Sequence, residues 1–159
     1  MTSNRRRKAE IRTYQAATGV PYMEARRQTT LPTLAEVMEE HPLLNDFGIG
    51  AFDPGRKTAQ QRREEIAAGR VELASHEDRV MEIVAWLRDN ITPIKTPTLN
   101  SYGLKHVLER SPGGWYVTNG EFIAAALIAH YPYKHDAPNT LFGMSARDIK
   151  RLQQAARSR

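Results

Sequence analysis

The stretch that decides the fold is residues 75–87, which read SHEDRVMEIVAWL. Four of its apolar side chains recur at the spacing of one helical face: Val80, Ile83, Val84 and Leu87. A stripe at i, i+3, i+4 and i+7 is typical of an amphipathic helix that packs one side against a core. Ser75 stands three residues before Asp78, which is the spacing of a helix N-cap. We therefore expect a helix that begins near Ser75 and buries this stripe.

Similar start and stop signals recur along the chain. Gly19 suits the end of a first helix, and Pro21 suits the first turn of a second. Four further helices begin at capping residues: Thr33 with Glu36, Thr58 with Gln61, Thr118 or Asn119, and Ser145 with Asp148. The helix from Thr58 is expected to end near Ala68, and residues 101–110 form another helix. These signals predict an all-α protein of about six to eight short helices.

The segments between these helices are expected to be irregular. Residues 45–55 contain three glycines and a proline, so they read as a loop that Phe47 and Phe52 anchor on the core. The prolines of residues 91–98 indicate an extended connector. At most one short hairpin or extended piece is expected, near residues 115–118. The predicted organisation is a basic helical arm at 1–30 and a single helical domain at 31–159, with a C-terminal unit at 99–159.

Composition excludes several classes of protein. The 159-residue chain contains no cysteine, so disulfides, a thiol nucleophile and a cysteine-bearing zinc site are excluded. No run of residues approaches the roughly 20 apolar positions that span a bilayer. The basic cluster at 5–8 is not followed by an apolar run, so no secretion signal is expected. We expect a cytoplasmic protein without a membrane partner.

No catalytic constellation is recognisable. The chain lacks a Gly-x-Ser-x-Gly elbow, and the glycine-rich loop at 48–50 lacks the third glycine of a dinucleotide-binding loop. His130, His135 and Asp136 lie close in sequence, but their spacing crosses a proline and does not match a helical pair of metal ligands. They are interpreted as ordinary loop residues. The sequence predicts no enzyme activity, no cofactor and no metal.

Charge is unevenly distributed. The net charge is +5 overall, +5 over residues 1–30, −5 over 31–54, +2 over 55–110 and +3 over 111–159. Basic ends of this kind can neutralise phosphates, and they can also dock on an acidic segment of the same chain. The candidate nucleic-acid-binding residues at the two ends are Arg5, Arg6, Arg7, Lys8, Arg12, Arg26, Arg27, Arg147, Lys150 and Arg151.

Residues 101–131 have the outline of a helix-turn-helix. The eight residues between Arg110 and Asn119 exceed the usual turn of three or four, and the second helix has the composition of a buried core helix. Within this unit, Lys105 and Arg110 on the first helix, with His106 beside them, are the better candidates for contact with DNA.

Two stretches resemble known groups of proteins. Residues 11–26, with Ala17-Thr18-Gly19 and then Tyr22-Met23-Glu24-Ala25, resemble a helical segment that recurs in actinobacterial plasmid and phage proteins. The stretch SYGLKH at 101–106, YVTNGEFIAAA at 116–126 and Pro138-Asn139 resemble uncharacterised proteins of bacterial mobile elements and prophages. The second resemblance covers a quarter to a third of the chain. It implies a setting, and it assigns no activity and no site residue.

The sequence thus predicts a nonenzymatic, nucleic-acid-associated accessory protein linked to a mobile element or prophage. Its basic ends would bind DNA in preference to RNA. The alternative is a protein-binding module, such as an antitoxin-like protein, an inhibitor or an assembly subunit, that contacts no nucleic acid. Short helices with modest apolar faces often need another protein surface to bury those faces, so a homo-oligomer is also possible in this class of protein.

Overall fold

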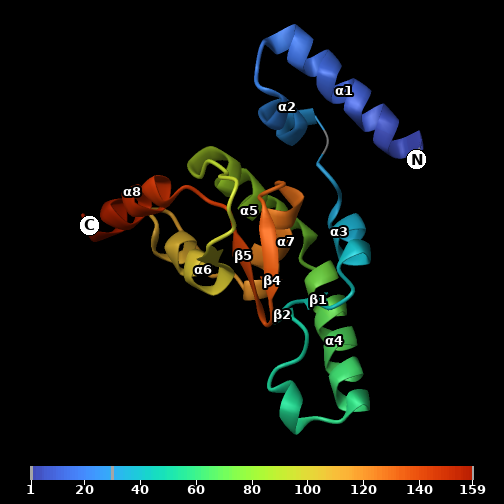
Figure 1. The fold of residues 1–159 in the computed structure, drawn as a ribbon. Coiled ribbons are helices and arrows are strands. Elements are labelled where there is room, and N and C mark those ends of the chain that lie inside the picture. The colour runs from blue at the N-terminus through green and yellow to red at the C-terminus, as the bar shows by residue number, and fades with distance from the viewer. Residues whose placement is uncertain (1, 30, 159) are drawn as a thin grey trace. The chain divides into compact units, whose positions relative to one another are not determined.

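The computed structural model describes the backbone of residues 2–29 and 31–158 (Figure 1). Near the N-terminus, the side chains of residues 2–4, 6, 7, 10 and 26–29 fall outside that description. The chain divides into two compact units, Met1–Pro32 and Thr33–Arg159. In the described residues, no helix has both the length and the apolar character that crossing a membrane requires.

The first unit consists of two helices. Helices α1 (Thr2–Thr18) and α2 (Tyr22–Thr29) pack against each other, and Ile11 and Ala25 are buried. Gly19 ends α1 with a positive φ of 72°, and its N–H donates to the carbonyl of Gln15. This left-handed conformation is strained for residues with a Cβ, which confirms the predicted stop at Gly19.

The second unit is mostly helical and also contains two small sheets, so the all-α expectation holds only in part. Its elements are α3 (Leu34–Glu40), β1 (Leu44–Asn45), β2 (Gly48–Ile49), η1 (Pro54–Arg56), α4 (Ala59–Ala74), α5 (Glu77–Asn90), β3 (Leu99–Asn100), α6 (Ser101–Arg110), α7 (Asn119–Ile128), β4 (Tyr133–Asp136), β5 (Asn139–Phe142) and α8 (Ala146–Arg157). Strands β1 and β2 form an antiparallel hairpin, and the second sheet has the antiparallel order β3-β5-β4.

The position of the second hairpin corrects the sequence prediction. We expected extended structure near 115–118, but the hairpin is β4–β5, in the segment we interpreted as a loop. Residues 115–117 pair with no strand. Two side chains of α6 instead form hydrogen bonds with the backbone N–H and carbonyl of Val117. The N–H of Val117 donates to Glu109 at 3.3 Å, and its carbonyl accepts from Lys105 at 3.1 Å. A local interaction with α6 thus replaces a β-ladder here.

Helix α7 is the centre of the core. All of its ten residues are buried, as its composition predicted, and it contacts α3, α5, α6 and β5 (Figure 1). The apolar stripe of α5, which consists of Val80, Ile83, Val84 and Leu87, is buried, and α5 packs on α7. Burial of aliphatic side chains of this size contributes about 1.5–3 kcal/mol each. This contact makes the α5–α7 pair the framework of the unit.

The junction between α4 and α5 differs from the prediction. Helix α4 continues past Ala68 to Ala74, because Leu73 is buried and holds the additional turns on the core. Ser75 therefore ends α4 instead of starting α5, and its hydroxyl donates to the carbonyl of Glu72 at 2.6 Å. Helix α5 begins one residue after His76 without a side-chain cap. The imidazole of His76 is thereby placed at a helix–helix corner.

The segment 45–55 is also more ordered than expected. It contains the β1–β2 hairpin, and Arg70 of α4 fixes its first strand by donating to the carbonyls of Met38, His41 and Leu44. Phe47 and Phe52 do not anchor it on the core. Both rings are exposed and pack edge-to-face on each other, with centroids 5.6 Å apart. Hydrogen bonds, and not the aromatic rings, hold the hairpin in place: Arg70 fixes the chain up to the start of β1, and the N–H groups of Asp46 and Ile49 donate to the carbonyls of Gly69 and Pro138.

Candidate functional site

A polar cleft opens beside the N-termini of α6 and α7. Its volume is about 890 Å³, and its walls come from the β1–β2 hairpin, α4, α6 and the start of α7. The lining side chains that carry polar chemistry are Asn45, Asp46, Glu65, Glu72, Tyr102, Lys105, His106, Glu109, Tyr116, Thr118, Asn119 and Asn139. Convergence of polar groups in a hollow of this size is the usual form of a binding site.

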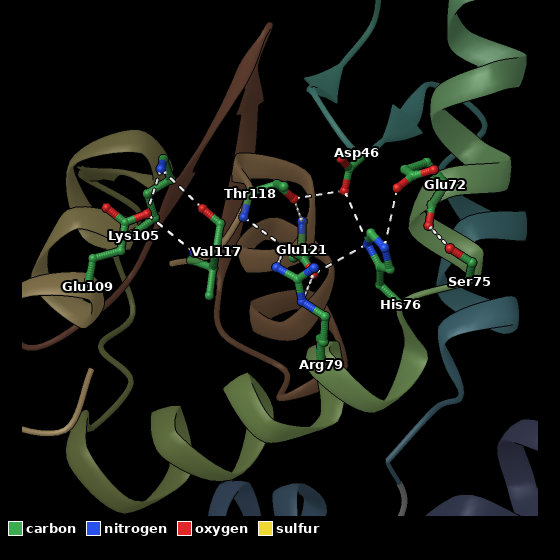
Figure 2. A network of polar contacts seen from close by, with 10 residues as sticks. All are labelled: Asp46, Glu72, Ser75, His76, Arg79, Lys105, Glu109, Val117, Thr118 and Glu121. Atoms are coloured by element: carbon green, nitrogen blue, oxygen red, sulfur yellow. Dashed lines mark hydrogen bonds and ion pairs between the residues drawn. The ribbon is translucent and has the colours of Figure 1, made fainter. Parts of the chain in front are cut away.

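One wall of the cleft carries a buried ion pair. The ammonium of Lys105 lies 2.8 Å from a carboxylate oxygen of Glu109, and both side chains are largely buried (Figure 2). The same ammonium lies 5.5 Å and 5.1 Å from the ring centroids of Tyr102 and Tyr116. Burial raises the pKa of Glu109, but hydrogen bonds from Lys105, His106 and the Val117 N–H outweigh it and hold that pKa below its ordinary value.

The floor of the cleft is organised by the amide of Asn119. Its oxygen accepts from the Ser101 hydroxyl at 3.0 Å, and its nitrogen donates to the side-chain oxygen of Asn139 at 2.9 Å. The Ser101 hydroxyl oxygen accepts in turn from the Thr140 N–H. These bonds join the first turns of α6 and α7 to the β4–β5 hairpin. Asn119 therefore fixes the geometry of the cleft.

Next to the cleft, His76 meets several carboxylates (Figure 2). Its Nδ1 lies 3.9 Å from Asp46 Oδ1 and 3.6 Å from Glu121 Oε2, while its Nε2 lies 3.3 Å from Glu72. Glu121 is completely buried and is paired with Arg79, whose Nε lies 3.0 Å from Oε2. We call Asp46, His76 and Glu121 the histidine–carboxylate cluster.

Two hydrogen bonds at the start of α7 orient this cluster. Glu121 accepts from the Thr118 N–H at 2.8 Å, and the Thr118 hydroxyl contacts the Glu121 N–H and Asp46 Oδ1. Thr118 and Glu121 thus form a capping box in which the carboxylate also serves the cluster. The sequence predicts a cap at Thr118 or Asn119, but it does not predict the arrival of Asp46 and His76.

The residues predicted to bind nucleic acid lie in two regions, one in each unit. In the first unit, Arg5, Lys8 and Arg12 are exposed on α1. The side chains of Arg6, Arg7, Arg26 and Arg27 lie outside the described part of the structure.

In the second unit, the predicted cations other than Lys105 are exposed on and beside α8. Ile149 and Leu152 are buried, which leaves the basic residues of the helix in solvent. A hollow of about 670 Å³ on one flank of α8 is lined by Arg147, Lys150 and Arg151. A second hollow of about 580 Å³ lies between α6 and α8 and is lined by Arg110 and Arg157. We call these five cations the basic surface.

The one acid lining the first of these hollows, among the described residues, is already engaged. Asp148 accepts from the Thr92 N–H at 2.8 Å, which holds its pKa below its ordinary value, and it also lies 3.8 Å from Arg151. Arg151 donates to the carbonyl of Asn90 at 2.9 Å as well. Arg147 and Lys150, which line the same hollow, are exposed, and no ion pair of theirs is found among the described residues.

Lys105 is the predicted site residue whose placement differs most from expectation. It was predicted, with Arg110, as a candidate for contact with DNA, but its ammonium is buried between Glu109 and the Val117 carbonyl. Helix α6 turns this position inward, and the ion pair with Glu109 offsets the cost of burial. Lys105 thus belongs to the polar cleft and not to the basic surface.

His135, in β4, lies beside His41, a contact that the sequence did not predict. His135 Nε2 lies 2.9 Å from Nδ1 of His41, and its Nδ1 lies 2.8 Å from the Thr140 hydroxyl. Burial lowers the pKa of both His41 and His135. The β4–β5 hairpin creates this pair, which residue spacing along the chain does not indicate.

Comparisons with protein-family models, curated proteins and solved structures find no match for this chain. The assignment of function therefore depends on the chain's own residues and their geometry.

Proposed function

We propose that the protein is a nonenzymatic, nucleic-acid-associated accessory protein that binds phosphates through its basic helices, in a mobile-element or prophage setting. The observation that carries this proposal is the basic surface around α8. Helix α8 docks through two aliphatic side chains and keeps its cations in solvent on both flanks. A helix with a purely structural role does not require an excess of positive charge in solvent. An excess of this kind attracts polyanions.

The charges of the basic surface suit the phosphate backbone better than the bases. Arginine and lysine side chains in exposed positions bind phosphates without reading sequence. Helix α7, the second helix of the apparent helix-turn-helix, is buried and offers no side chain to a groove. We therefore propose binding that depends strongly on salt and weakly on base sequence, with duplex DNA as the first ligand to test.

The experiment is a fluorescence-anisotropy titration of a labelled duplex at about 50 and about 200 mM salt. Each lost phosphate contact lowers the salt slope by about 0.9. The double variant Arg147→Ala, Lys150→Ala should therefore reduce the ratio of low-salt to high-salt affinity roughly tenfold, equally on unrelated sequences. Arg56→Ala removes an exposed arginine from η1 and serves as the matched control.

The arm is tested separately with the variant Arg5→Ala, Arg6→Ala, Arg7→Ala, which should lower affinity for all sequences alike. Duplex RNA is titrated in parallel to measure the preference for DNA. Absence of salt-sensitive binding at micromolar protein, or equal binding by the α8 double variant and the Arg56→Ala control, would refute the proposed role of the basic surface.

A second candidate, a protein-binding module, is favoured by an exposed apolar groove. Leu43, Phe47 and Phe52 are exposed and line a hollow of about 750 Å³ with η1 and α4. Contiguous exposed apolar surface often marks a protein interface. Size-exclusion chromatography with light scattering separates the candidates. A monomer that changes mass only with DNA supports the first, and a stable dimer unaffected by DNA supports the second.

A further inference from the structure

We infer that the histidine–carboxylate cluster is a binding site for a divalent cation of the zinc class. Asp46 comes from the turn of the β1–β2 hairpin, His76 from the α4–α5 corner, and Glu121 from the first turn of α7 (Figure 2). One ligand atom from each lies within 4.8 Å of the others. An imidazole nitrogen and carboxylate oxygens are donors that zinc takes in proteins.

The imidazole of His76 is oriented for this role. Its Nε2 lies 3.3 Å from a carboxylate oxygen of Glu72, one turn earlier in the chain. Since a carboxylate only accepts, this contact favours the tautomer with its proton on Nε2. The lone pair then sits on Nδ1, the nitrogen that faces Asp46 and Glu121. A carboxylate on the far nitrogen is the usual orienting partner of a metal-bound histidine.

Two atoms that face each other in the cluster lack hydrogen bonds. His76 Nδ1 and Glu121 Oε2 are both buried, and neither makes a hydrogen bond of good geometry, although Oε2 has an ion-pair partner in Arg79, whose Nε lies 3.0 Å away. They are 3.6 Å apart, which is longer than an N–H···O bond. In this tautomer Nδ1 and the two carboxylates are all acceptors. The carboxylates have donors elsewhere, in Thr118 and Arg79, but Nδ1 faces them with no donor between, which is costly for a buried acceptor. A cation between them removes this cost.

The spacing of the ligand atoms suits such a cation. Zinc–ligand bonds of about 2.1 Å in tetrahedral geometry separate neighbouring ligand atoms by roughly 3.4 Å. The separations from His76 Nδ1 are 3.6 Å to Glu121 and 3.9 Å to Asp46. Closing them requires a shift of about half an ångström or less at these two contacts, and of at most about 1.4 Å at the Asp46–Glu121 pair, which lies within 4.8 Å, so side-chain rotation reaches the geometry.

Charge supports a divalent ion. With His76 neutral, the carboxylates of Asp46, Glu72 and Glu121 give three negative charges, and Arg79 gives one positive charge. The sum is −2, which a divalent cation balances and a single proton on His76 does not. Arg79 approaches Glu121 from a half-exposed position, so it offsets one of the three negative charges and leaves a net charge of −2 around the ion.

Three protein ligands leave a coordination position for water or another small ligand, as in zinc sites that are not purely structural. Asp46 and Glu72 also line the polar cleft, which gives an ion a route to the site. The rival occupant is a proton on His76 Nδ1, which a titration with Zn²⁺ distinguishes from a metal.

The test is calorimetric titration of the full chain with Zn²⁺, repeated with Co²⁺ to follow its absorbance. We expect one ion per chain. His76→Ala should abolish binding, and Asp46→Asn should weaken it at least tenfold. Glu72→Gln, which leaves the three ligands and removes the orienting carboxylate, should weaken it by about 10–100-fold. Glu82→Gln removes an exposed carboxylate from α5 and should leave affinity unchanged.

Far-UV circular dichroism checks that each variant is folded. Glu72 is 60% exposed, so its variant is expected to fold even where those at the buried cluster do not. Zn²⁺ should also shift the NMR signals of the His76 ring in the wild-type chain. The inference is overturned if micromolar Zn²⁺ does not bind, which leaves the proton as occupant. It is overturned equally if His135→Ala abolishes binding while His76→Ala retains it, because the ion then lies at the His41–His135 pair.

Discussion

Two glycines in first turns of helices provide a sharp test of the packing around the cleft. Glycine inside a helix is less favourable than alanine by up to about 1 kcal/mol. Gly103 of α6 has no atom within 4 Å of the position where a Cβ would stand, so Gly103→Ala should stabilise the protein by at most this amount. Gly120 of α7 has the opposite surroundings. A Cβ there would lie 1.9 Å from the carbonyl oxygen of Asn45 and 2.7 Å from the backbone of Asp46.

The overlap at Gly120 outweighs the gain in helix propensity. Real Cβ contacts are not shorter than 3.0 Å, so the hairpin would have to retreat by about 1.1 Å, the difference between 3.0 and 1.9 Å. The obstacle is backbone, and the Gly120 N–H donates to the Asp46 carbonyl across the same gap. Overpacking of this kind costs about 1–3 kcal/mol. We expect Gly120→Ala to destabilise the protein by about 2 kcal/mol, or roughly 4–8 °C in Tm.

The assay is urea and thermal unfolding followed by circular dichroism at a helical wavelength, with wild type and both variants side by side. Gly103→Ala is the matched control, since it makes the same chemical change in the first turn of a neighbouring helix. The reasoning is refuted if Gly120→Ala unfolds at the wild-type urea midpoint or above it. It is also refuted if Gly103→Ala is destabilised to the same extent.

Two further predictions concern buried ionisable groups. Burial lowers the pKa of His41 and His135, so the unfolded chain binds more protons and stability should fall as pH drops below about 6.5, where unfolded histidine titrates. Urea midpoints at several pH values measure this loss, and His135→Asn should flatten the profile; an unchanged profile would count against it. Glu109→Leu leaves the ammonium of Lys105 buried without its partner and should cost about 3 kcal/mol, which chemical denaturation measures. Adding Lys105→Met should recover most of that loss, and an additive double variant would contradict the pairing.

Much of the helical structure could be predicted because its signals are local. The capping box of Thr58 with Gln61 and the buried stripe on α5 depend on residues within one or two helical turns, and the structure confirms both. The prediction failed at Ser75, where the same capping signal fits the end of one helix and the start of another. Burial of Leu73, a tertiary effect, decided that α4 continues to Ala74.

The strands were missed for a related reason. Strands β4 and β5 are four residues each, and only one side of the hairpin has a clear burial pattern. Residues 115–117 looked extended but form no strand, and Glu109 and Lys105 occupy the groups of Val117 that a partner strand would need. Short strands depend on a partner for their hydrogen bonds, and the sequence does not name that partner.

The sequence by itself determined the helices, the buried character of α7 and the basic charge of both ends, because periodicity, capping and charge are properties of neighbouring residues. Tertiary structure alone decided which polar side chains meet. Thr118 reaches Asp46 across 72 positions, and His76 joins them only because α4 ends at Ser75 and turns the chain. The close approach of Gly120 to the β1–β2 hairpin brings Asp46 to the start of α7. This approach results from the packing of a helix against the backbone of the hairpin, which residue spacing along the chain does not predict.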